Sequence, residues 1–320
     1  MAAPKKSRDP RPKLIIGYDG RNASDDALAL GADLCHLLNA QPIVLSVAPW
    51  PRFMHGEDLK VALEVDAGDA LIRACTKLSD LDPIAKAVAH RSAAEEMALV
   101  AKAESATAIV IGASHRGALG KVLLGSVGRS LLHAAPCAVA VAPTGYARDA
   151  AGAPKRIAVA FDGGPEAWAA LDTGIFLAQA AHAELALLTV AGTDFYMTDS
   201  VFPAVGIGDM ADRERDYAQQ ILDEAASKVP EAVSRTTVLM QGAPCGLLAD
   251  ASSEYDLMVL GSRGHGPMGR TVLGSVSGCV MDEAASPVLV LPRGSKLIRH
   301  GLVEAGSDLL SQAAGARPSG

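Results

Sequence analysis

The chain has 320 residues, of which 49% are hydrophobic and 20% charged, so it can form two globular domains with cores of their own and does not resemble a disordered chain. Its formal net charge of −7 at pH 7 excludes a global basic field that would attract nucleic acid or an anionic membrane. The five cysteines are widely spaced and contain no Cys-x-x-Cys pair, so we expect buried thiols in a reducing compartment, with neither a disulfide framework nor a thiolate metal site.

The first residues, MAAPKKSRDPRPK, include basic residues and prolines with no apolar region after them. This composition predicts a disordered tail over residues 1–12 and not a signal peptide. No later apolar run approaches the ~18–20 residues that a membrane-spanning helix needs. We therefore expect a cytoplasmic protein that binds neither membranes nor nucleic acid.

After this tail, short runs rich in Ile, Val and Leu alternate with longer segments of helical periodicity. The expected strands are 13–18, 42–47, 84–89, 108–112 and 137–141. The expected helices are 23–39, 57–79, 93–104 and 125–134. Near-continuous apolar strands that alternate with helices predict a parallel sheet covered on both faces, which is the doubly wound α/β fold. In such sheets ligands lie beyond the carboxyl ends of the strands, where the winding reverses.

The same pattern occurs a second time. KLIIGYDGRNASDDALALGADLCHLLNAQPIVLSVAP at 13–49 matches RIAVAFDGGPEAWAALDTGIFLAQAAHAELALLTVAG at 156–192, and APCAVAVAP at 135–143 matches ASPVLVLP at 285–292. Such an internal repeat predicts two copies of one domain. We assign domains to residues 13–147 and 156–293, a linker to 148–155 and a tail to 294–320. The strands expected in the second half are near 156–161, 185–190, 235–240, 256–260 and 287–291.

Each half contains a glycine-rich segment directly after an apolar run, GASHRGALGKVLLGS at 112–126 and GSRGHGPMGRTVLGS at 261–275. A glycine-rich turn from a strand into a helix permits positive φ angles and presents free N–H groups at the positive end of the helix dipole, which suits phosphate. The alternative is a tight turn without a ligand, but the recurrence of Gly-Ser at a fixed distance favours a site. The second segment contains the dinucleotide fingerprint Gly-x-Gly-x-x-Gly, yet it closes its domain and no acid ends the next strand. In the first segment, HRGALGK fails the Walker pattern.

The second segment follows the spacing Gly-x2-Gly-x9-Gly-Ser. Together with the closing SPVLVLP and the opening IAVAFDGG, this spacing resembles the universal stress protein family, as a tandem of two such domains over about residues 13–293. The resemblance implies a Rossmann-like sheet of five parallel strands in the order 3-2-1-4-5 in each half, with an ATP site between strands 1 and 4. It implies that Asp162 contacts the adenosine moiety and that Val190 lies beside the adenine. The residues it implies for holding the ribose and phosphates are Gly261, Ser262, Arg263, Gly264, Gly274, Ser275, Val276 and Ser277.

The first half follows this pattern with one departure, His115, which stands where the second glycine belongs. The positions that match are Asp19, Val47, Gly112, Gly125 and Ser126. His115 has three possible consequences: a steric cost at a positive φ, an imidazole that blocks the phosphates, or a hydrogen bond to them. The last would favour the charged imidazole, so affinity would fall as the pH rises. The second half is therefore the stronger candidate for ATP binding.

The resemblance implies a regulatory stress-response protein that binds ATP, with Mg²⁺ to screen the triphosphate, and that is not an enzyme. The first alternative is an ATP-hydrolysing or adenylate-forming enzyme, which would need a nucleophile, a base or metal carboxylates near the phosphates. Against it, AFDGGPE lacks the Ser residues and the Asp of the pyrophosphatase loop SGGxDS, and the chain has no HxGH sequence. The second alternative is a structural or interaction module without a ligand.

The last strand of each half, AVAVAP and VLVLP, would leave an apolar unpaired sheet edge. The resemblance implies that these strands pair antiparallel with a neighbouring domain, both as an internal pseudo-dimer and in a homodimer. We assign Trp168 to packing. Cations near the two segments can either pair with a phosphate or lie on solvated surface. They are Arg129, His133, Arg263, His265 and Arg270.

Overall fold

The computed structural model describes residues 11–49, 57–114, 122, 124–149, 152–192, 207–262 and 274–292. The expected tail at 294–320 and most of the tail at 1–12 lie outside these residues. Arg11 and Pro12 are described and are held in place. The Arg11 Nη2 donates to Asp82 Oδ2 at 3.2 Å, and the Pro12 carbonyl accepts from the Gln41 N–H at 2.8 Å. These two residues of the expected tail therefore contact the folded domain.

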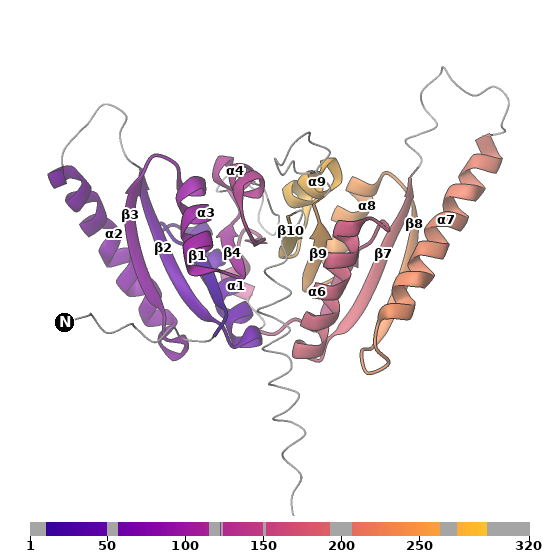
Figure 1. The fold of residues 1–320 in the computed structure, drawn as a ribbon, viewed down its shortest axis with the longest axis horizontal. Coiled ribbons are helices and arrows are strands. Elements are labelled where there is room, and N and C mark those ends of the chain that lie inside the picture. The colour runs from indigo at the N-terminus through magenta and orange to yellow at the C-terminus, as the bar shows by residue number, and fades with distance from the viewer. Residues whose placement is uncertain are drawn as a thin grey trace, which may run out of the picture.

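The two halves contain matching series of strands and helices (Figure 1). The first half consists of β1 (Lys13–Gly17), α1 (Asn22–Leu38), β2 (Gln41–Pro49), α2 (Glu57–Lys77), β3 (Ile84–His90), α3 (Ala93–Glu104), β4 (Ala108–Gly112), α4 (Ser126–Ala134) and β5 (Ala138–Ala142). The second half consists of β6 (Arg156–Ala160), α6 (Pro165–Ala181), β7 (Glu184–Gly192), α7 (Ile207–Lys228), β8 (Arg235–Gly242), α8 (Pro244–Ala251), β9 (Leu257–Gly261), α9 (Ser275–Glu283) and β10 (Val288–Leu291). Between them, the short helix α5 (Tyr146–Asp149) covers the expected start of the linker, and single 3-10 turns lie at Ser79–Leu81 and Ser252–Glu254.

All ten strands belong to one sheet, in the order β3-β2-β1-β4-β5-β10-β9-β6-β7-β8. Each half thus has the strand order 3-2-1-4-5, which confirms the expected fold. Every pairing is parallel except the one between β5 and β10, where Val141 lies opposite Val288 and Val139 opposite Val290. This antiparallel pair joins the two five-stranded sheets into one, as the expected internal pseudo-dimer requires.

The pairing of β5 with β10 corrects the expected mode of homodimer formation. Each of these strands is hydrogen-bonded on both sides, β5 to β4 and β10, and β10 to β9 and β5. No edge of either strand remains for a second chain. The terminal strands therefore form the internal pseudo-dimer, and a homodimer cannot use them in the same way.

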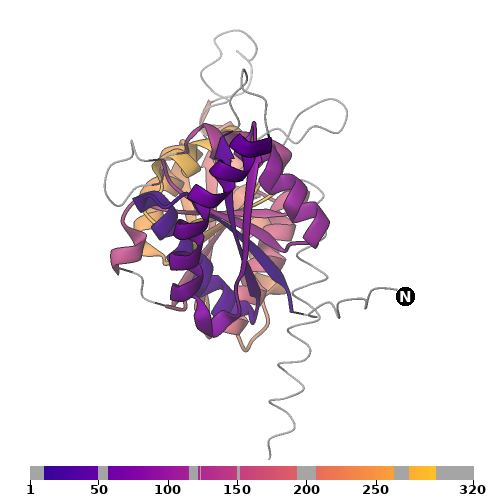
Figure 2. The same cartoon turned by 90° about the vertical axis from the view of Figure 1, so that its left-hand side faces the viewer.

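The core has two layers, one on each face of the sheet, and both run through the two halves. Alternate residues of β1 show this, since Leu14 and Ile16 belong to one layer and Ile15 to the other. Helices α1, α2, α6 and α7 supply the first layer, and α3, α4, α8 and α9 the second. Figure 2 shows helices on both sides of the sheet. The sheet and its two layers therefore extend from one half into the other.

In each half, the first helix lies close against the first strand, and a glycine at equivalent positions in the two halves makes this possible. A Cβ on Gly31 of α1 would overlap the side chain of Ile16, and a Cβ on Gly174 of α6 would overlap that of Val159. These glycines let the first helix of each half lie directly on its first strand. No helix in the described residues is both long and apolar enough to span a bilayer.

The structure contradicts one expectation drawn from the cysteines. Cys245 in α8 and Cys279 in α9 form a disulfide, with their Cα atoms 5.7 Å apart. Spacing along the chain gave no sign of it, because the two residues are 34 positions apart and meet only when α8 and α9 pack on the same face of the sheet. The other cysteines are free thiols, and Cys35 and Cys137 are fully buried as expected.

Candidate functional site

A cavity of about 550 Å³ lies at the carboxyl ends of β6, β7 and β9. This is the switch point of the second half, where β9 and β7 lie on opposite sides of β6. Seven of the predicted site residues line the cavity: Asp162, Val190, Gly261, Gly274, Ser275, Val276 and Ser277. The fold therefore brings together positions that are more than 100 residues apart in the sequence.

The turn after β6 places the Asp162 carboxylate at the mouth of the cavity. Its Oδ1 accepts a hydrogen bond from the Gly164 N–H at 2.9 Å, and Gly163 between them has a φ of +76°, which suits glycine. Thr189 of β7 donates from its Oγ1 to the carbonyl of Phe161 at 3.0 Å and so ties this turn to the neighbouring strand. Asp162 is exposed and is thus available to a polar group of a ligand.

The amino end of α9 forms the opposite wall. Gly274 is the N-cap residue, no side chain caps the helix, and Ser275 and Val276 of its first turn line the cavity. Backbone N–H groups in a first turn have no partner within the helix, and the helix dipole adds partial positive charge there. Ser277 fixes this end in place, because its Oγ donates to the Gly261 carbonyl at 2.9 Å. The wall therefore offers main-chain donors that suit an anion.

Gly261 has a structural role that the sequence did not reveal. A Cβ at this position would come 2.5 Å from the backbone carbonyl atoms of Glu166, in the first turn of α6. The glycine thus allows α6 to pack against the end of β9, in addition to lining the cavity. Its neighbour Ser262 is 1% exposed, donates its N–H to the Leu291 carbonyl, and leaves its own Oγ without a hydrogen-bond partner.

Two carboxylates that the sequence analysis did not select also line the cavity, Glu166 from α6 and Glu214 from α7. With Asp162 they give three carboxylates, and no described lining residue is a lysine or arginine. Carboxylate and phosphate oxygens together suit Mg²⁺. The donor set therefore fits a nucleotide that arrives with Mg²⁺. The predicted residues Arg263 and Gly264, with His265 and Arg270, lie outside the described residues.

The remaining wall is apolar and comes from several elements. Val190 and Leu188 of β7, Ile221 of α7, and Leu248 of α8 contribute to it. Trp168, which we assigned to packing, meets the ring of Phe161 edge-on with the ring centroids 4.8 Å apart, and it packs against the buried core. A cavity with one apolar side and one polar end is typical of sites for small organic ligands.

The first half places its predicted residues at the equivalent strand ends, but their surroundings differ. Asp19 Oδ1 accepts from the Arg21 N–H at 3.0 Å, and the Arg21 Nε lies 3.8 Å from Asp19 Oδ2. Val47 lies near the end of β2 and Gly112 ends β4, where a Cβ would overlap the Ala23 carbonyl. His115 lies outside the described residues, so none of its three expected consequences is tested.

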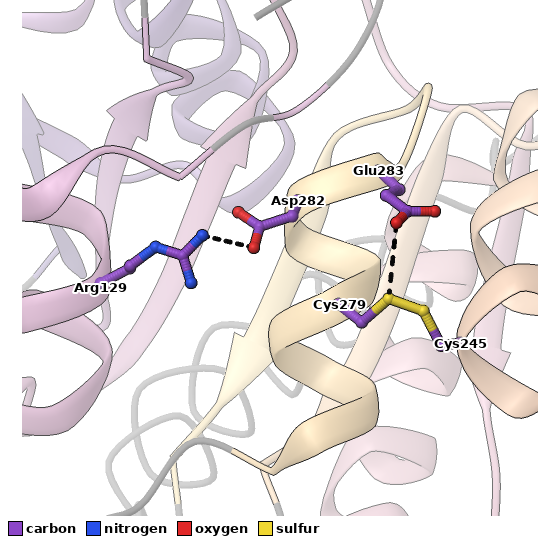
Figure 3. Close-up of a disulfide and its surroundings, with 5 residues drawn as sticks. All are labelled: Arg129, Cys245, Cys279, Asp282 and Glu283. Carbon is purple, nitrogen blue, oxygen red and sulfur yellow. Dashed lines mark hydrogen bonds and ion pairs between the residues drawn. A yellow bond between two sulfur atoms is a disulfide. The ribbon is translucent and has the colours of Figure 1, made fainter.

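The start of α4 is linked to the second half through Asp282. Gly125 is the N-cap of α4 and Ser126 its first residue. The N–H of Leu124, just before them, donates to Asp282 Oδ1 at 3.1 Å. The Arg129 Nη2, within α4, lies 2.5 Å from Asp282 Oδ2 (Figure 3). Arg129 therefore makes an ion pair between the halves.

Comparisons with known proteins agree with the fold. The model of the universal stress protein family matches residues 10–143 and again 154–292. Universal stress protein Rv2005c of Mycobacterium tuberculosis is 30% identical over 313 residues, which cover 91% of this chain and 99% of the relative. Universal stress protein YxiE of Bacillus subtilis is 30% identical over 144 residues, 42% of this chain and 97% of the relative.

Among solved structures, a universal stress protein from Archaeoglobus fulgidus superimposes with a TM-score of 0.65 at 19% identity. The match covers 88% of this chain and 98% of that chain. At this identity the similarity shows the fold alone. Both the sequence and the fold are thus similar to universal stress proteins along most of this chain.

Proposed function

The chain belongs to the universal stress protein family, and from this premise we propose that it binds ATP in the cavity of its second half and acts as a regulatory protein. The observation that carries the proposal is the meeting of Asp162, Val190 and the amino end of α9 around one cavity of about 550 Å³. A volume in this range accommodates a ligand of nucleotide size.

Each part of the cavity suits one part of the nucleotide. The apolar wall around Val190 suits the adenine base, and the exposed Asp162 carboxylate suits the hydroxyl groups of the ribose. The N–H groups of the first turn of α9, with the Ser275 hydroxyl, suit the phosphates. Mg²⁺ would screen the triphosphate from the nearby carboxylates of Glu166 and Glu214.

A regulatory role agrees better with this cavity than catalysis does. The described lining residues include no lysine, histidine or cysteine, and the polar groups at the amino end of α9 are main-chain donors and serine hydroxyls. We assign the carboxylates of Glu166 and Glu214 to holding Mg²⁺, so the cavity as a whole binds the nucleotide. We therefore expect occupancy by ATP to change the conformation or the partners of the protein.

The proposal is tested by titrating the purified protein with MgATP in a calorimeter and repeating the titration with two matched variants. Asp162→Ala removes a carboxylate that faces the ligand, so we expect roughly tenfold weaker binding, the effect of losing one charge-assisted hydrogen bond. Asp19→Ala makes the same change in the first half, where the carboxylate is already engaged by Arg21. Asp19→Ala should leave the affinity for MgATP at the second-half site, the tighter of any two measured, unchanged.

Two results would contradict the proposal. If the wild-type protein shows no heat of binding with MgATP, the module without a ligand becomes the better description. If Asp19→Ala weakens binding and Asp162→Ala does not, the site lies in the first half. Release of inorganic phosphate during the same incubation, at a rate above that of MgATP alone, would favour the enzymatic alternative.

A further inference from the structure

Cys245 and Cys279 connect the two helices that flank the candidate nucleotide cavity (Figure 3). Cys245 lies in the first turn of α8, next to Pro244, which lines the cavity. Cys279 lies in α9, one turn after Ser275 and Val276, which line it from the other side. The bond therefore joins two walls of one cavity.

The disulfide also closes the part of the chain that contains the glycine-rich segment. The two cysteines are 34 positions apart, and the enclosed sequence includes all of β9 and the whole of residues 261–274. A covalent link across such a segment reduces the number of arrangements open to its ends. The amino end of α9, where the phosphates are proposed to bind, is the end of the segment that the bond restrains.

The chemistry of this pair differs from that of the other three cysteines. Burial raises the pKa of the thiols of Cys35 and Cys137 to about 12, and it also raises the pKa of Cys75. These thiols are therefore poor nucleophiles. Cys245 and Cys279 are only half-buried, so small oxidants and reductants can reach them. Cys245 has the further feature that the positive end of the α8 dipole stabilises a thiolate in the first turn.

A carboxylate adjoins the bond on its exposed side. Glu283 Oε1 lies 3.9 Å from Cys279 Sγ, so the thiol of the reduced form can donate a hydrogen bond to it (Figure 3). The helices of the first half that correspond to α8 and α9 are α3 and α4, and neither contains a cysteine. The pair is thus a property of the second half alone, where the candidate cavity lies.

We propose that Cys245 and Cys279 form a reversible thiol–disulfide site that controls nucleotide affinity in the second half. The proposal rests on the nucleotide function proposed above. With the bond formed, α9 is held against α8 and its first turn is preorganised for the phosphates, so binding costs less ordering. With the bond broken, α9 keeps its core contacts and the hydrogen bond from Ser277 to Gly261. It loses only the covalent restraint to α8.

The redox step balances with hydrogen peroxide as the oxidant. One thiolate attacks a peroxide oxygen, so an S–O bond forms, the O–O bond breaks and water leaves after proton uptake. The second thiol attacks this sulfur, the S–S bond forms, and the S–O bond breaks with loss of a second water. The two sulfurs together lose two electrons, which the peroxide gains. A dithiol reductant reverses the step and takes the two electrons back as it forms its own disulfide.

The test measures thiol content and ATP affinity on the same preparations of the full chain. After treatment with peroxide, alkylation under denaturing conditions followed by mass spectrometry should label three cysteines, and after reduction with dithiothreitol it should label all five. MgATP titrations should then show roughly fivefold weaker binding to the reduced protein. Cys279→Ser should bind with the weaker affinity under both conditions.

Two further variants keep the test decisive. Cys245→Ser should reproduce the behaviour of Cys279→Ser. The test therefore still works if one of the two variants does not fold. Cys75→Ser is the matched control, because Cys75 is partly exposed but unpaired, and it should keep the full difference between oxidised and reduced protein.

Each outcome bears on the inference. Five labelled cysteines after peroxide would overturn it, as would a zinc ion that stays bound to the reduced pair with Glu283 and blocks oxidation. Equal ATP affinity in the two states would overturn the inference and leave the nucleotide function standing. Absence of ATP binding in both states would overturn both.

Discussion

The two halves share a backbone but differ in chemistry where the first strand ends. In the first half, Tyr18 donates from its hydroxyl to Asp25 Oδ1 at 3.2 Å, and burial together with this carboxylate raises the pKa of the tyrosine. In the second half an aromatic pair, Phe161 and Trp168, stands at the corresponding positions, 143 residues later. A polar pair has thus been exchanged for an apolar one while the turn beside it kept its shape.

The aspartates that follow differ in the residue two positions later. Asp162 accepts from the N–H of Gly164 and lines the cavity, whereas Asp19 accepts from the N–H of Arg21, whose Nε lies 3.8 Å from Asp19 Oδ2. The comparison teaches that two halves with one fold can differ in chemistry through a few side chains at the strand ends. These side chains are the changes that can be tested.

The largest expected effect is a loss of stability when the glycines that end β4 and β9 are substituted. Gly112→Ala should destabilise the protein by about 3 kcal/mol or more, because the added Cβ overlaps the Ala23 carbonyl in the backbone of α1, which cannot move aside cheaply. Gly261→Ala should cost less, since its closest approach to Glu166 is 2.5 Å. Urea unfolding measures both changes in the free energy of unfolding.

Gly68→Ala provides the control for these glycine variants. Gly68 lies in α2 with no other atom within 4 Å of an added Cβ, so alanine there should stabilise the helix by up to about 1 kcal/mol. A loss of stability at Gly68 similar to that at Gly112 would show that backbone flexibility, and not close packing, explains the glycines.

A smaller effect is expected at the link between the halves. Asp282→Ala removes the acceptor of the Leu124 N–H and the partner of Arg129, and we expect a loss of about 1 to 2 kcal/mol. Arg129→Ala should cost under about 1 kcal/mol, because the Arg129 side chain is 53% exposed and the hydrogen bond to Leu124 survives. Thermal unfolding of the two variants side by side measures the difference, and equal costs would contradict the role given to the Leu124 N–H.

The smallest effect concerns the opposite end of the sheet and depends on pH. Hydrogen bonds from Lys13 and Lys86 lower the pKa of Glu104 from its ordinary value of 4.5 to about 2. A carboxylate with a lowered pKa contributes stability that is fully present above pH 4.5 and is lost as the pH falls towards 2. Glu104→Gln should therefore cost less than about 1 kcal/mol at pH 7 and only a small part of that near pH 2.

The second half provides the comparison for this prediction. Arg156, which begins β6 as Lys13 begins β1, lies over the ring of Tyr255 and donates to the Glu254 carbonyl at 2.8 Å. These two contacts involve no carboxylate, and the carboxylate that pairs with the Arg156 Nε, Glu184 Oε2, lies at the longer distance of 3.8 Å. Unfolding curves of wild type and Glu104→Gln that differ by the same amount at pH 7 and pH 2.5 would contradict the assignment.

The strands could be predicted from the sequence because buried parallel strands are nearly continuous apolar runs. AIVIG and AVAVA in the first half and LMVLG and VLVL in the second became β4, β5, β9 and β10 almost to the residue. The resemblance to a family added the antiparallel contact between the two halves. Apolar runs alone would not have given it, since they do not specify which edges pair.

The parts that could not be predicted depend on contacts between helices. Glu214 lies in the charged stretch DRERD and Glu166 in the first turn of α6, so in the sequence both are typical of a solvated helix face. Cys245 and Cys279 likewise come together only when α8 and α9 pack on one face of the sheet. The link from Asp282 to Leu124 crosses from one half to the other, and nothing in the spacing of either residue indicates it.

The antiparallel pairing of β5 with β10 has an evolutionary consequence. When two identical subunits meet through such strands, every substitution in the gene is imposed on both copies, and the two sites must stay alike. Here the copies are encoded one after the other in a single gene. The cysteine pair, Cys245 and Cys279, can therefore arise in the second half and Arg21 in the first without changing the other half. The covalent fusion thereby frees each half to specialise while the shared sheet keeps them in a fixed one-to-one ratio.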